Sequence, residues 1–133
     1  MGNYKDLVSY QKAYKLAMRI FEISKTFPME ERFSLTNQIR RSSRSVCANL
    51  AEAFRRKLYR RYFTSKINDC LTENSETEVW IEFAKDCKYL EQKVYLELLS
   101  LNNEVGKLLW FIANNPNKFL SPPKKTPTRT PNS

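Results

Sequence analysis

The feature that most constrains the fold of this chain is the scarcity of helix-breaking residues between positions 3 and 115. That stretch contains one proline, Pro28, and one glycine, Gly106. Sheet-rich folds need glycine at their tight turns, and proline interrupts a helix wherever it falls in the interior. With 133 residues, the chain has the length of one domain. We therefore expect an all-α fold built from long helices.

Apolar residues recur every three or four positions in four segments, which is the spacing of one helix face. The predicted helices are residues 8–26, 34–57, 60–87 and 91–114. The first ends at Phe27-Pro28, because the residue before a proline disfavours helical backbone angles. Ser34 is placed to cap the second helix. Short connections force neighbouring helices to run antiparallel, so we expect an antiparallel up-down-up-down four-helix bundle.

The predicted domain organisation is a bundle over residues 1–115 followed by a tail over residues 116–133. The tail includes SPPKKTPTRTPNS, which is rich in proline and basic residues. A segment of this composition has too few apolar residues to bury a core of its own. We therefore expect a disordered C-terminal tail.

Several residues inside the predicted helices depart from a simple apolar stripe. Asn74 and Thr77 interrupt the stripe of the third helix, and they need hydrogen-bond partners if they are buried. Gly106 weakens the fourth helix by about 1 kcal/mol relative to alanine. The first helix carries two neighbouring stripes, an arc wide enough to be buried on two sides: Tyr10, Ala13, Tyr14, Ala17, Phe21 and Ser24, and Leu16, Ile20, Ile23 and Phe27.

The net charge of +9 is unevenly distributed along the chain. Residues 32–66 contain ten Lys or Arg and one acid, Glu52, whereas residues 67–104 contain nine Asp or Glu and three Lys. Polyanions such as nucleic acid are the natural partners of so basic a chain. The acidic segment indicates a second role, in self-association or in pairing within the chain.

The basic segment centres on residues 38–57, QIRRSSRSVCANLAEAFRRK. On an ideal helix, Arg40, Arg41, Arg44 and Arg55 fall within an arc of about 100° opposite the apolar stripe. Arginine suits bidentate contacts with phosphate. Glu52 is the only acid nearby in sequence, and it is spaced to pair with an arginine three or four positions later, Arg55 or Arg56.

The basic run continues into the start of the third helix, where aromatic residues are interleaved with it. Aromatic side chains beside arginines can stack on unpaired bases, although core packing is the commoner role of such rings. The interleaved rings are Tyr59, Tyr62 and Phe63. The residues that we expect to contact nucleic acid are Arg40, Arg41, Arg44, Arg55, Arg56, Arg60 and Arg61.

The sequence argues against an enzyme, and we expect no catalytic residues, metal site or cofactor. It contains no histidine, which removes the usual acid-base group near neutral pH and the commonest metal ligand. Its three cysteines, Cys47, Cys70 and Cys87, lack zinc-ligand spacing, and we expect all three to pack as reduced, small apolar groups. With no signal peptide or membrane span visible, the expected location is cytoplasmic.

The sequence resembles the bacterial four-helix bundle proteins encoded in intervening sequences of large-subunit ribosomal RNA genes. The most specific matching elements are Gln38-Ile39-Arg40-Arg41 and, after a fixed spacing, Asn49-Leu50-Ala51-Glu52. Other matching residues are Leu7, Gln11-Lys12-Ala13, Phe27-Pro28, Leu35-Thr36, Ser45-Val46 and Ala48, and a weaker Ser-x-x-Glu element, Ser75 and Glu78.

The resemblance implies a fold and an assembly more directly than an activity. It implies an antiparallel four-helix bundle that forms a homopentameric ring, with Asn49, Glu52, Ser75 and Glu78 as a structural motif. Where the family usually has glycine after the glutamate of its second helix, this chain has Ala53. Since alanine lets a helix continue, we expect the turn into the third helix near Lys57 to Arg60.

Two functions from different classes remain open. The first is an oligomer that binds nucleic acid, RNA or structured nucleic acid, through the arginines of the second helix. The second is a protein-interaction scaffold whose arginines pair with acidic residues of adjacent subunits, with a retroelement reverse transcriptase as one partner by analogy. A membrane-surface role ranks third, because the apolar face of the second helix is needed for the core.

Overall fold

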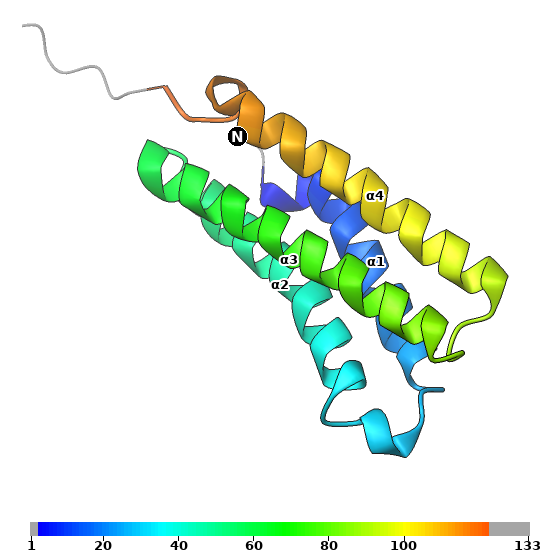
Figure 1. Cartoon of the computed structure of the whole chain (residues 1–133). Helices are drawn as coiled ribbons and strands as arrows, with labels where there is room; N and C mark the ends of the chain where they lie inside the picture. Colours follow the sequence, from blue (N-terminus) through cyan, green and yellow to red (C-terminus); the bar gives the residue numbers. More distant parts are fainter. Residues whose placement is uncertain (1–2, 123–133) are drawn as a thin grey trace, which may run out of the picture.

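The computed structural model describes residues 3–122 and shows four helices, α1 Val8–Ser24, α2 Leu35–Arg55, α3 Arg60–Asp86 and α4 Gln92–Asn114. They run alternately up and down, and each packs against its neighbours in sequence, while α1 also packs against α4 (Figure 1). Three short 3-10 turns, η1 Tyr4–Asp6, η2 Met29–Glu31 and η3 Pro116–Lys118, complete the described chain, which contains no strand. The predicted all-α up-down-up-down bundle is confirmed, with every helix end within two residues of its prediction.

The packed part of the chain extends past residue 115, the predicted end of the bundle. Turn η3 follows α4, and Phe119 then packs edge-on against Phe54 and Phe111, with ring centroids 6.0 and 6.1 Å apart. The remainder of the predicted tail, residues 123–133, lies outside the described residues. None of the helices over residues 3–122 is long and apolar enough to cross a membrane.

The connection between α3 and α4 shows how a chain with so little glycine makes a tight helix end. Lys88 adopts a left-handed backbone conformation, with φ of 66°. The Tyr89 N–H donates to the Ala84 carbonyl oxygen and the Lys88 N–H to that of Lys85, both at 2.9 Å. This is the hydrogen-bond pattern of a Schellman motif, in which glycine is the usual left-handed residue.

The start of α2 is held by Glu31 rather than by the predicted Ser34 cap. Ser34 precedes the helix, but its side chain caps no backbone N–H. Its hydroxyl instead donates to Glu31 Oε1 at 2.6 Å, and the same oxygen accepts from the Leu35 N–H at 3.5 Å. The Tyr89 hydroxyl donates to Glu31 Oε2 at 2.9 Å. Glu31 therefore joins the α1–α2 connection to the α3–α4 connection.

These hydrogen bonds shift the titration of both partners. The bonds from Ser34 and Tyr89 lower the pKa of Glu31 because they favour its ionised form. The bond to Glu31, together with partial burial, raises the pKa of Tyr89 to about 12.

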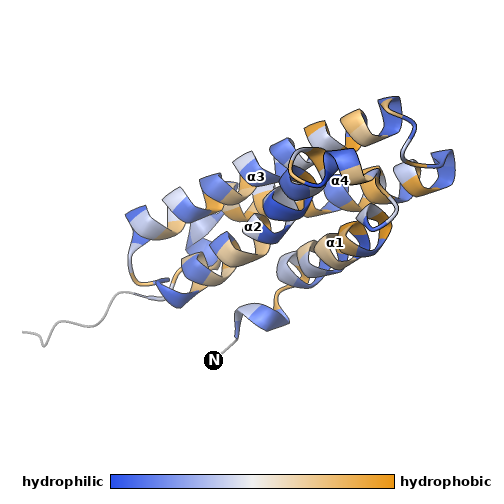
Figure 2. Ribbon diagram, turned by 90° about the horizontal axis from the view of Figure 1, so that it is seen from below, coloured by the Kyte–Doolittle hydropathy of each residue, from blue (hydrophilic) through white to orange (hydrophobic). Residues whose placement is uncertain are grey.

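The bundle core consists of two apolar clusters, one toward each end of the molecule. Leu50, Phe63 and Leu109 belong to the cluster near the α2–α3 turn, and Ile20, Ile39 and Ile81 to the other. Along each helix, hydrophobic residues alternate with hydrophilic ones (Figure 2). Cys70 is buried as predicted, but Cys87 is exposed, so the prediction that all three cysteines pack as apolar groups is wrong for Cys87.

A layer of buried polar side chains separates the two clusters. Asn74 Nδ2 of α3 donates to the backbone oxygen and to Oδ1 of Asn102 of α4, at 3.1 and 3.0 Å. Asn102 Nδ2 donates back to the Asn74 carbonyl oxygen at 3.2 Å. The Thr77 hydroxyl donates to Ser42 Oγ of α2 at 2.8 Å. The prediction that Asn74 and Thr77 require partners if buried is confirmed, and the layer joins three helices.

Gly106 makes room for this polar layer. A Cβ atom at position 106 would lie 2.7 Å from Asn74 Oδ1, closer than carbon and oxygen can approach. Asn74 cannot move aside freely, because its amide nitrogen is bonded to Asn102. The glycine that weakens α4 as an isolated helix is therefore required by the packing of α4 against α3.

We expect Gly106→Ala to lower the free energy of unfolding by about 1 to 2 kcal/mol, since the clash outweighs the gain in helix propensity. Urea denaturation measures the change. Asn103→Ala, at an exposed neighbouring position on α4, is the control and should not destabilise the chain. Equal stabilities for Gly106→Ala and the natural protein would show that Asn74 is free to relax.

Glu31 should make stability depend on pH in the acid range. Because its pKa is lowered on folding, the ionised carboxylate stabilises the folded chain above the ordinary value of 4.5, and this contribution is lost as the pH falls through the lowered value. We expect Glu31→Gln to destabilise the protein at neutral pH and to match it in acid, as measured by denaturation at several pH values. A pH-independent difference for Glu31→Gln would contradict the assignment.

Candidate nucleic-acid interface

Helix α2 presents its arginines away from the core because its apolar residues occupy the opposite face. Leu35, Ile39, Val46 and Leu50 are buried. Four arginines, with Thr36, Asn37, Ser45 and Ala48, line a shallow groove of about 600 Å³ along the outer face of the N-terminal half of α2. We call it the α2 groove, and its arginines are Arg32, Arg40, Arg41 and Arg44.

Arg40 and Arg44 lie on the side of the α2 groove next to α1. Arg40 Nε donates to Ser24 Oγ at 2.7 Å. The guanidinium carbons of Arg40 and Arg44 lie 4.9 and 5.5 Å from the centroid of the Phe21 ring. These contacts orient the side chains without neutralising them, because neither arginine forms an ion pair with a carboxylate of residues 3–122.

Arg41 differs from its neighbours because it pairs with α3. Its Nη2 lies 2.7 Å from Glu76 Oε1, and its Nη1 lies 3.6 Å from Glu73 Oε2. The Glu73 side chain is only 17% exposed, and its Oε2 accepts no hydrogen bond from the described residues. Part of the acidic segment thus neutralises one arginine within the same chain, which was one of the roles that the sequence left open.

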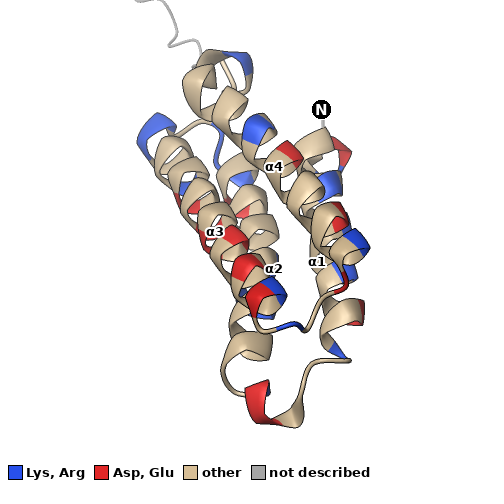
Figure 3. Cartoon of the chain, turned by 45° about the vertical axis from the view of Figure 1, so that its right-hand side comes forward, with Lys and Arg blue, Asp and Glu red and all other residues tan. Residues whose placement is uncertain are grey.

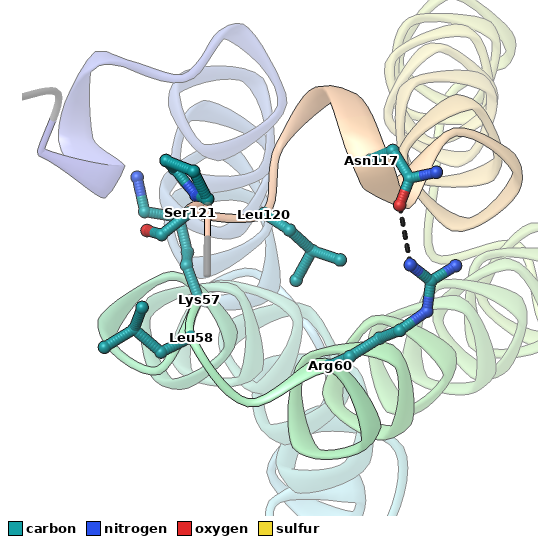
Figure 4. A pocket seen from close by; sticks show the side chains of 7 residues that line it. Lys57, Leu58, Arg60, Asn117, Leu120 and Ser121 are labelled. Carbon is teal, nitrogen blue, oxygen red and sulfur yellow. Dashed lines mark hydrogen bonds between the residues drawn. The ribbon is translucent and has the colours of Figure 1, made fainter. Parts of the chain in front are cut away.

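A second group of basic residues surrounds the α2–α3 turn, and we call it the turn cluster. The Arg55 guanidinium lies over the Tyr4 ring at 5.6 Å, and that of Arg56 over the Tyr62 ring at 5.1 Å. Arg60 Nη1 donates to Asn117 Oδ1 at 2.6 Å beside a pocket of about 420 Å³, which Lys57 and Leu120 also line (Figure 4). The cluster comprises Arg55, Arg56, Lys57, Arg60 and the exposed Arg61.

The structure divides the seven predicted arginines into two groups rather than one continuous face. Arg44 and Arg55 share an arc of α2, but eleven residues separate them, about 16 Å along the helix axis. Helix α3 carries acidic residues along its length and basic residues at its N-terminal end (Figure 3). Six of the seven form no ion pair with a described carboxylate, and Arg41 is the exception.

The residues of the predicted structural motif contact other residues of the bundle or lie exposed on its surface. Asn49 Nδ2 donates to the carbonyl oxygen and the hydroxyl of Ser45, at 2.9 and 3.1 Å. Glu52 pairs with Lys66 of α3 at 3.0 Å, so the predicted pairing with Arg55 or Arg56 is wrong. Ser75 and Glu78 are exposed on α3. The turn after α2 covers residues 56–59, which matches the prediction made from Ala53.

The aromatic residues nearest the arginines are mostly different from those that the sequence indicated. Phe63 is fully buried in the core, and Tyr62 is half-buried, whereas Tyr59 is exposed. Tyr14, which belongs to the wide apolar arc predicted to be buried on two sides of α1, is 53% exposed in the single chain. The sequence signal for this exposure was that position 14 holds tyrosine rather than phenylalanine or leucine. The tyrosine hydroxyl favours positions at the edge of a core.

Within residues 3–122, no group of three or more His, Cys, Asp or Glu side chains could hold a metal ion. Burial raises the pKa of the Cys47 thiol to about 11 and that of Cys70 still higher, which keeps both in the protonated, unreactive form at neutral pH.

The fold and the charge pattern define the class of protein, a four-helix bundle with uncompensated arginines on its second helix. The chain belongs to the 23S rRNA-intervening sequence protein family, whose sequence profile matches residues 5–110. It is similar to a crystal structure of a protein with unknown function from the S23 ribosomal protein family of Bacteroides thetaiotaomicron VPI-5482, at 33% identity and a TM-score of 0.75. The match covers 83% of this chain and 98% of the other. No match was found among curated proteins.

Substitution of the paired Arg41 and of an arginine without a described carboxylate partner should have different effects on stability. Arg41→Met removes the cation next to the largely buried Glu73 carboxylate, so we expect the free energy of unfolding to fall by about 1 kcal/mol. Arg44→Met removes a cation that has no carboxylate partner among the described residues and should change it by less than about 0.5 kcal/mol. Chemical denaturation compares the two variants. Equal changes in the free energy of unfolding would contradict the division into a paired arginine and unpaired ones.

Proposed function

We propose that the protein is a non-enzymatic, oligomeric RNA-binding protein whose arginines contact phosphates. The observation that carries this proposal is a set of arginines that pair with no carboxylate of residues 3–122, namely Arg40, Arg44, Arg55, Arg56, Arg60 and Arg61. By contrast, Lys12, Arg19, Lys25 and Lys66 each pair with an acid. Within residues 3–122 the bundle therefore neutralises these four cations and Arg41, and it leaves the six arginines available.

The chemistry of the available groups favours a phosphate-rich partner. Guanidinium groups bind phosphate oxygens bidentately, and ring contacts with Phe21, Tyr4 and Tyr62 orient four of them. Contacts to phosphates carry little sequence information, so the proposal covers RNA and structured nucleic acid without base specificity. RNA is favoured because the family takes its name from 23S rRNA intervening sequences.

A protein-interaction scaffold is the second candidate, and a different surface favours it. Met29, Phe33 and Phe83 are exposed near the end of the bundle opposite the turn cluster, and Phe33 and Phe83 line a pocket of about 380 Å³. The nearby Trp80 Nε1 is buried without a hydrogen-bond acceptor among the described residues. An apolar surface of this kind suits a protein partner, such as the reverse transcriptase of a retroelement. Assembly into a homopentamer belongs to either candidate.

The test compares Arg40→Gln/Arg44→Gln with a control that removes the same charge from paired cations, Lys12→Gln/Arg19→Gln. We expect the first variant to bind RNA at least tenfold more weakly at low salt, with a smaller dependence of affinity on salt concentration, because fewer counterions are released. The control should resemble the natural protein. Binding is followed by fluorescence anisotropy with labelled RNA and DNA, and the mass of each species by light scattering.

Two results would count against RNA binding. The natural protein could ignore RNA and DNA even at low salt, or the Arg40/Arg44 variant could dissociate into smaller species. The second result would place these arginines between subunits and favour the scaffold.

A further inference from the structure

A row of aromatic rings from η1 and α1 lies beside the arginines of α2. The Tyr4 and Tyr10 ring centroids are 5.0 Å apart, and those of Tyr10 and Tyr14 are 6.1 Å apart. Phe21 continues the row two turns further along the same helix. We call the rings together with Arg40, Arg44 and Arg55 the tyrosine–arginine seam.

The seam has cations at both ends and rings between them. Arg55 lies over Tyr4 at one end, and Arg40 and Arg44 lie over Phe21 at the other. The axial distance from Arg44 to Arg55 is about 16 Å, calculated from the rise of an α-helix, which is the span of a few nucleotides. Between these ends the α1 side is accessible, since Tyr14 is 53% and Met18 is 45% exposed.

The arrangement suits a strand whose bases are free to leave the backbone. A base can stack on an aromatic ring only if it is unpaired and unstacked, whereas a duplex keeps its bases inside and presents phosphates alone. A surface meant only for duplex phosphates gains nothing from exposed rings. A row of half-exposed rings bounded by guanidinium groups gives both contacts that single-stranded nucleic acid requires.

We propose that the tyrosine–arginine seam binds a short unpaired stretch of RNA, with bases stacked on Tyr14 and its neighbours and phosphates held by Arg40, Arg44 and Arg55. This inference rests on the proposed RNA-binding function and adds the form of RNA that is recognised. Tyr14 contributes most to the preference, because it is the most exposed ring of the row, while Tyr4 and Tyr10 are half-buried.

The experiment measures binding of an unstructured single-stranded RNA and of the same strand annealed to its complement. We expect Tyr14→Ala to weaken single-strand binding about tenfold and to leave duplex binding unchanged, in line with the loss of one stacked base. Tyr14→Phe keeps the ring and should keep the affinity. Phe83→Ala removes a ring of matching exposure, 54%, from α3 and serves as the control.

The outcomes separate this inference from the function on which it rests. If the Arg40/Arg44 variant loses affinity for both RNAs while Tyr14→Ala changes neither, the arginines bind RNA and the stacking role is overturned. If the natural protein binds neither RNA even at low salt, the RNA-binding function fails as well. A change in the oligomer mass of Tyr14→Ala would assign the exposed face of α1 to a contact between copies of the chain and would also overturn the inference.

Discussion

The reciprocal hydrogen bonds between Asn74 and Asn102 are the constraint on which the rest of the bundle depends. They lie in the layer that separates the two apolar clusters, where a shift of one turn would leave both amides buried without partners. Such a shift is costly, because a buried amide without a partner loses its hydration without compensation. Gly106 lets α4 approach closely enough for the pair to form. Apolar contacts stabilise the bundle, while these bonds select one register.

The same layer determines which cations stay free for a ligand. The bond from Thr77 to Ser42 aligns α3 with α2, and Glu73 and Glu76 lie within a turn of Thr77. In that register, both carboxylates form ion pairs with Arg41, whose side chain extends from α2 toward α3. Arg40 and Arg44 point to the other side of α2, toward Phe21 of α1. The interior of the bundle therefore separates one internally paired arginine from those that define the candidate interface.

Sequence periodicity was sufficient for the helices and their order, because each helix has to bury one face and the connections are short. It could not show the partition of the arginines, since Arg41 differs from Arg40 and Arg44 only through the neighbour that each one faces. It could not show that Tyr14 stays exposed in the single chain, because a helical wheel shows a direction but not how far the adjacent helix extends to cover it. It also assigned the start of α2 to Ser34, whereas the cap comes from Glu31, a group whose position depends on Tyr89, 58 residues further along the chain.

Arginines without a carboxylate partner among the described residues affect the stability of the unbound protein. Arg40 and Arg44 lie one helical turn apart on α2, so these two like charges repel each other when no anion is present. Ring contacts with Phe21 offset part of this repulsion. A polyanion bound as proposed would remove the rest, and any ligand that binds only the folded state stabilises it. On the proposed function, the charge pattern that weakens the isolated bundle would also couple its stability to the presence of a bound polyanion.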